Sequence, residues 1–83
     1  MLNTNITKAD AGWLLNFYKK EMTHSYLDYK RLAMHKLAQE LIRGHEVFIP
    51  ECKCNYGAFQ QISISLFEQY EEELKKIVED KNA

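Results

Sequence analysis

The chain has 83 residues, of which 46% are hydrophobic and 28% charged, and its formal net charge is −1. These values are those of one ordinary globular domain spanning residues 1–83, and they exclude a disordered chain and a strongly basic nucleic-acid binder. No apolar run approaches the ~20 residues of a membrane helix, and residues 1–5 lack a signal-peptide pattern. We therefore expect a cytoplasmic protein that does not bind membranes. Because so short a chain builds a small core, oligomerisation is a possibility from size alone.

The first predicted helix follows residue 7. Thr7 and Asp10 have the spacing of a capping box, in which the side chain of each residue accepts a hydrogen bond from the backbone N–H of the other. Apolar residues continue at helical spacing as far as Met22, where we expect the helix to end. Trp13 and Phe17 are four residues apart and widen its apolar face.

A second helix is predicted from Ser25 to Gly44, after a connection of only two residues. Ser25 and Asp28 form another candidate capping box, and Gly44 suits a left-handed closing position. A helix with one apolar side must bury that side, so we predict that Leu37 and Leu41 are core residues. The apolar stripe consists of Leu27, Ala33, Met34, Leu37, Ala38, Leu41 and Ile42, with Tyr26 at its entry.

Residues 46–50 are predicted to be extended. Val47, Phe48 and Ile49 are consecutive apolar residues, and Pro50 disfavours a helical conformation for the residue before it. We expect this segment to lie across the helices or to form one short edge strand. A turn-rich loop follows over residues 51–57.

The last third of the sequence supports two alternatives. Residues 61–66 alternate polar and apolar side chains as a half-buried strand does, with Val47–Ile49 as its natural partner. That order of elements resembles a winged helix. A stripe at helical spacing from Phe59 to Ile77 instead predicts one long helix over residues 58–79, which we favour because it accounts for more residues. The predicted fold is therefore mainly α: a small three-helix domain, made of a helical hairpin and a long C-terminal helix, with a short extended segment at 46–50.

His45, Cys52 and Cys54 are the candidate metal ligands, because zinc accepts imidazole and thiolate groups. A structural zinc site needs four ligands and usually has two to four residues between paired cysteines, whereas one residue separates these two. The same spacing would strain a disulfide between them. We therefore expect two reduced cysteines and no metal or other cofactor, with zinc as a weak alternative.

The aromatic residues give the strongest indication of function. Ten aromatic side chains are more than three short helices can hide, and Trp13, Phe17 and Tyr29 lie at the edge of the predicted stripes or outside them. We predict that these three bind a partner, which is another protein or a second copy in a homodimer. No phosphate-binding loop or nucleophile elbow is present, so we expect a non-enzymatic regulatory protein of the adaptor or inhibitor type.

The alternative is a DNA-binding transcriptional regulator of winged-helix-like order. In that hypothesis the second helix enters the major groove and presents basic side chains to bases and phosphates. Asp28 and Glu40 interrupt the basic residues, and lysines outnumber arginines by nine to two, so we do not expect nucleic acid as a partner. The basic residues concerned are Lys30, Arg31, Lys36 and Arg43.

Overall fold

The structure, a computed structural model, describes residues 2–80 and consists of helices joined by irregular segments. In order, the helices are α1 (Lys8–Phe17), α2 (Tyr29–Arg43) and α3 (Tyr56–Glu79). A π-helical turn, Tyr18–Met22, continues α1, and a 3₁₀ turn, Lys53–Asn55, precedes α3.

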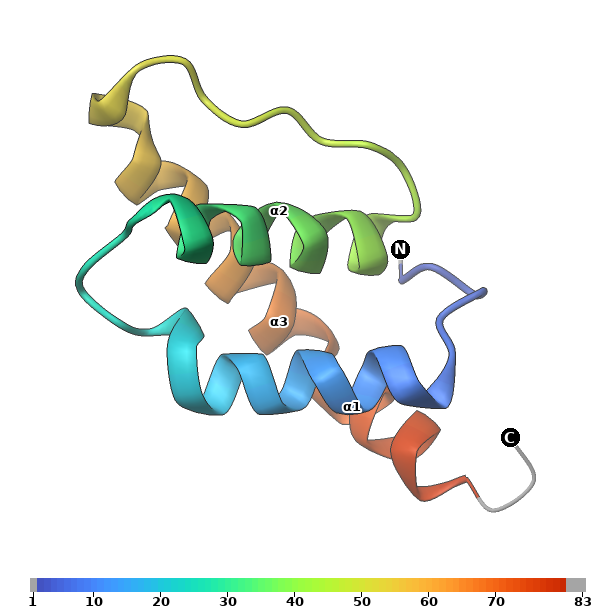
Figure 1. The fold of residues 1–83 in the computed structure, drawn as a ribbon. Helices are drawn as coiled ribbons and strands as arrows, with labels where there is room; N and C mark the ends of the chain where they lie inside the picture. The colour runs from blue at the N-terminus through green and yellow to red at the C-terminus, as the bar shows by residue number, and fades with distance from the viewer. Residues whose placement is uncertain (1, 81–83) are drawn as a thin grey trace.

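The arrangement of the helices confirms the predicted mainly α, three-helix domain. In Figure 1, α1 and α2 run in opposite directions and α3 crosses behind both, and α3 packs against each of them. Residues 61–66 belong to α3, and residues 2–80 contain no strand, so the strand alternative is wrong. None of the helices in this part of the chain is long and apolar enough to cross a membrane.

The ends of the first two helices are set by short-range hydrogen bonds. The Thr7 hydroxyl accepts a hydrogen bond from the Asp10 N–H at 3.1 Å, as its spacing predicted. The prediction that Ser25 caps the second helix is wrong: the cap is Asp28, whose carboxylate accepts from the Arg31 N–H at 2.9 Å. Gly44 ends α2 in the left-handed conformation, with φ 80°, as expected.

The main core lies where α3 meets the other two helices. Its buried residues come from all three helices and from the π-helical turn. Tyr18 and Phe67 stack beside this core, with ring centroids 3.8 Å apart. The buried residues are Ala11, Leu14, Phe17, Met22, Ala38, Ile42, Phe67, Tyr70 and Leu74.

The buried face of α2 differs from the predicted one. Leu37, predicted to be a core residue, is 44% exposed, and Leu41 is only partly buried. The centre of the buried face is His35, which is two residues, or about 200° around the helix, from Leu37. The residues that α2 buries are Leu32, His35, Ala38, Gln39 and Ile42.

Two polar side chains, Gln39 and Ser63, account for this rotation. The Gln39 Nε2 group donates to the Ser63 hydroxyl at 2.9 Å and to the Phe59 carbonyl at 3.1 Å. Ser63 in turn donates to the same carbonyl at 3.3 Å. Because a buried polar group is costly without hydrogen bonds, this network fixes which side of α2 faces α3.

Residues 46–50, predicted to be extended or to form a short edge strand, have no regular secondary structure and run back along α2 (Figure 1). Val47 is the anchor of this segment: the side chain is buried beside Leu32 and Phe59, and the N–H donates to Glu40 Oε1 at 3.4 Å. The neighbouring Phe48 points outward and is 86% exposed. One apolar side chain of the segment is therefore buried while the next stays in solvent.

Two glycine substitutions should have opposite effects on stability. Gly44→Ala should lower the free energy of unfolding by at least about 1–2 kcal/mol, since an L side chain is strained in the left-handed conformation. The new Cβ would also lie 3.1 Å from the Asn3 side chain. Gly12→Ala should instead raise the free energy by about 0.5–1 kcal/mol, because nothing lies within 4 Å of the added Cβ in α1. Urea denaturation of both variants measures the difference, and a stabilising Gly44→Ala would contradict the cap.

Candidate functional site

The connection between α1 and α2, residues 23–28, has no regular secondary structure but is held in place by side chains. The Gln60 Nε2 group, from α3, donates to the Met22 carbonyl at 3.1 Å and to the His24 carbonyl at 2.6 Å. The His24 Nδ1 atom accepts from the Tyr26 N–H at 3.1 Å. The connection is therefore tied to α3 although it contributes little to the core.

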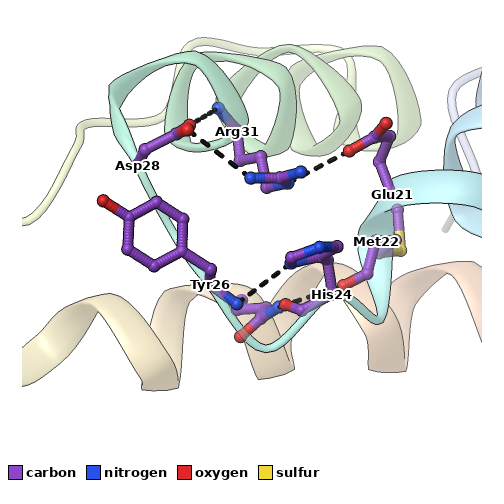
Figure 2. Close-up of polar contacts among 7 residues, drawn as sticks. Glu21, Met22, His24, Tyr26, Asp28 and Arg31 are labelled. Carbon is purple, nitrogen blue, oxygen red and sulfur yellow. Dashed lines mark hydrogen bonds and ion pairs between the residues drawn. The ribbon is translucent and has the colours of Figure 1, made fainter.

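Arg31 links the two ends of this connection. Its Nε group lies 3.0 Å from a Glu21 carboxylate oxygen, and one terminal nitrogen lies 3.5 Å from an Asp28 oxygen. Figure 2 shows the guanidinium between the two carboxylates, with the Tyr26 ring directed away from the His24 imidazole. Ion pairs near the surface contribute little stability, so the main effect of this bridge is to position the connection. The hydrogen bond from the Arg31 N–H and the nearby guanidinium hold the pKa of Asp28 below its usual value.

A pocket of about 300 Å³, which we call the tyrosine pocket, lies between this connection, the first turn of α2 and the residues at the start of α3. Its volume is at the lower end of the range of ligand pockets. Tyr26 is 65% exposed and Tyr29 is 85% exposed, so two of its aromatic side chains are largely in solvent. The residues that line it include Tyr26, Leu27, Tyr29, Leu32, Lys53 and Tyr56.

Phe48 follows a residue that packs against a wall of the tyrosine pocket. Its neighbour Val47 is buried in a small cluster with Leu32 and Phe59, against which Leu27 and Tyr56 also pack. Because Leu27, Leu32 and Tyr56 also line the pocket, the segment that carries the exposed Phe48 passes close to it. We call Tyr26, Tyr29, Phe48 and Tyr56 together the aromatic surface. Exposed aromatic groups of this kind are typical of protein-interaction sites.

The structure does not bring the three predicted partner-binding residues together. Trp13 is half-buried and stacks on Phe17, with ring centroids 5.1 Å apart. Phe17 is only 2% exposed and belongs to the core, so its ring does not reach the surface. Tyr29, at the first position of α2, is exposed as predicted and joins Tyr26 and Tyr56 around the pocket.

The candidate metal ligands do not form a cluster among the described residues. His45 is exposed, and its Nδ1–H donates to the Glu46 carbonyl at 3.0 Å. Cys52 is exposed and disulfide-bonded, so the expectation of a reduced thiol is wrong for this residue, and its sulfur is not a thiolate ligand. The side chain of Cys54 lies outside the described part of the chain. Within that part, no group of three His, Cys, Asp or Glu side chains could hold a metal ion.

His35 is a titratable group that is fully buried. Its ring and that of Phe17 meet edge to face with centroids 5.1 Å apart, and neither ring nitrogen has a hydrogen-bond partner within residues 2–80. Burial lowers its pKa from 6.5 to about 4. The imidazole is therefore neutral at pH 7, and a proton on it would have to be accommodated without a partner.

Comparisons with known proteins give no family for this chain. No family model and no curated protein matches the sequence, and no solved structure matches the fold.

Acidification should destabilise the fold through His35. Its pKa is lower in the folded state, so between pH 6.5 and 4 the unfolded chain binds a proton that the folded chain does not. The free energy of unfolding should thus fall by about 2 kcal/mol from pH 7 to pH 5 and level off near pH 4 as far as His35 is concerned. Urea denaturation across this range measures the loss. His35→Leu should flatten the profile, and an unchanged slope in that variant would assign the effect to other groups.

The connection should loosen when its tie to α3 is removed. In Gln60→Ala, two carbonyls lose their donor, so the amides of residues 23–26 should exchange with solvent severalfold faster while those of the middle of α3 keep their protection. Hydrogen exchange followed by NMR measures both. Gln61→Ala is the matched control, because Gln61 is the exposed neighbour. Equal acceleration in the two variants would show that Gln60 does not hold the connection.

Proposed function

We propose that this chain is a small, non-enzymatic regulatory protein of the adaptor or inhibitor type, which binds another protein or a second copy of itself through the aromatic surface. The observation that carries the proposal is the meeting of two largely exposed tyrosines, Tyr26 and Tyr29, with Tyr56 around one pocket. Aromatic side chains are enriched where proteins bind one another, since a tyrosine buries a large area and loses few rotamers on binding.

The rigidity of the backbone at this site supports the same function. Tyr29 is the first residue of a capped helix, and Tyr26 lies in the connection that Gln60 and Arg31 hold in place. A surface that is ordered before binding loses less conformational entropy when a partner arrives. Exposure of these rings to water is unfavourable in the isolated chain, whereas contact with a partner would remove them from it.

The DNA-binding alternative receives less support. Two of the four basic side chains on α2 already neutralise carboxylates, Arg31 with Glu21 and Asp28, and Lys36 with Glu40. The long α3 also takes the place of the strand pair that a winged-helix order requires. We therefore keep protein binding as the proposal and treat retention on duplex DNA at low salt as the observation that would favour the alternative.

Photo-crosslinking inside cells that produce the protein tests the proposed function. With a benzophenone amino acid in place of Tyr29, irradiation should give a discrete protein adduct, which includes a covalent dimer of the chain itself. The matched control carries the same group in place of Leu37, an exposed apolar residue of α2 that lies outside the pocket. Denaturing gels and mass spectrometry identify the adducts. Adducts of equal yield from positions 29 and 37 would contradict the proposal. The absence of any adduct when the same group is placed in turn at positions 26, 29 and 48 would also contradict it.

A further inference from the structure

We propose that the partner at the tyrosine pocket is a second copy of this chain, and that Phe48 of each copy inserts into the pocket of the other. This inference rests on the proposed function and specifies its partner. Phe48 is the most exposed large hydrophobic residue in the described chain, at 86%. A buried phenylalanine ring contributes substantially to an interface when it fills a pocket of matching chemistry.

The positions of Phe48 and the pocket suit a two-fold dimer. Val47 packs in one cluster with Leu32, which also lines the pocket, so the segment that carries Phe48 passes beside a wall of the pocket. In a two-fold dimer the same patch is used by both copies, and any contact made once is made twice. A patch that contains both a projecting aromatic ring and an aromatic-lined pocket meets this requirement for self-complementarity.

The charges around the two halves of the contact are opposite. The segment 45–51, which carries Phe48, has two exposed carboxylates, Glu46 and Glu51, and no lysine or arginine. The rim of the pocket has the exposed Lys53, and Lys30 is exposed in the first turn of α2. The remaining acid at the pocket, Asp28, is already paired with Arg31. Insertion of Phe48 would thus bring acidic residues of one copy toward basic residues of the other, which favours this partner over an unrelated one.

The expected dimer is weak, and its amount should depend on concentration. Two inserted rings and their surroundings make a smaller interface than the ~800 Å² per partner of a stable complex. Sedimentation equilibrium over a concentration series should therefore show a monomer that becomes a dimer as concentration rises. Phe48→Ser and Tyr29→Ser should each weaken the dimer by tenfold or more, the effect of removing an aromatic anchor. Leu37→Ser, which alters an exposed residue outside the pocket, should not weaken it.

Mixing the two weakened variants gives the sharper test. In a heterodimer of Phe48→Ser with Tyr29→Ser, the intact Phe48 of one chain meets the intact pocket of the other, and both defects fall in the second contact. The mixture should therefore dimerise at a lower concentration than either variant alone. Circular dichroism and urea denaturation confirm that both variants remain folded, as expected because both side chains are exposed.

Distinct outcomes overturn the inference and the function it rests on. A wild-type monomer at every concentration, a dimer that both substitutions leave unchanged, or a mixture that associates no better than its components would overturn the second copy as partner. If position 29 then crosslinks to a different protein, the proposed function stands with another partner. If position 29 also gives no adduct above the Leu37 control, both proposals fail.

Discussion

The buried hydrogen bonds from Gln39 to Ser63 and to the Phe59 carbonyl determine the arrangement of this small domain. The apolar residues of α2 are spread widely enough around the helix to allow several rotations against α3. The observed rotation gives the Gln39 amide two acceptors, whereas an unpartnered buried amide would cost about 1–3 kcal/mol. The polar network therefore selects the packing that the apolar residues alone leave undetermined.

This rotation affects both the middle and the N-terminal end of α2. In the middle of the helix it turns His35 inward against Phe17 and Leu37 outward into solvent. At the N-terminal end it brings Leu32 beneath Val47 and Phe59, which fixes one wall of the tyrosine pocket and the position of the segment that carries Phe48. The exposed aromatic surface is thus a product of the same constraint that buries an unpaired histidine. Both features are unfavourable for an isolated monomer.

The sequence predicts those parts of the fold that depend on neighbouring residues. The Thr7 cap, the left-handed Gly44 and the length of α3 follow from local spacing, and the structure has all three. The rotation of α2 could not be predicted, because it depends on burying a glutamine and a histidine that a hydrophobic pattern assigns to solvent. The start of α2 also differs from the predicted one. Asp28 caps the helix in place of Ser25, and its carboxylate also pairs with the Arg31 guanidinium, a contact between side chains that the capping pattern does not include.

Only part of the candidate site could be predicted from the sequence. Tyr29 could be selected from the sequence because it lies outside the apolar stripe of its helix. Tyr26 could not be selected, because the sequence places it in the first turn of the predicted helix, whereas α2 begins three residues later, at Tyr29. The exposure of Phe48 does not follow from the sequence pattern, because Val47, Phe48 and Ile49 are all apolar and only Val47 is buried.

Stability and binding are connected in a chain of this size. Its core is small, and one fully buried position is given to an imidazole with no hydrogen-bond partner among the described residues. A partner that binds only the folded state stabilises that state by mass action, and the stabilisation rises with partner concentration. If the partner is a second copy, the chain's own concentration sets how much of it is folded as acid destabilises it. Dimerisation would then shift the acid-induced loss of structure to lower pH, since only the unfolded monomer gains the His35 proton near neutral pH.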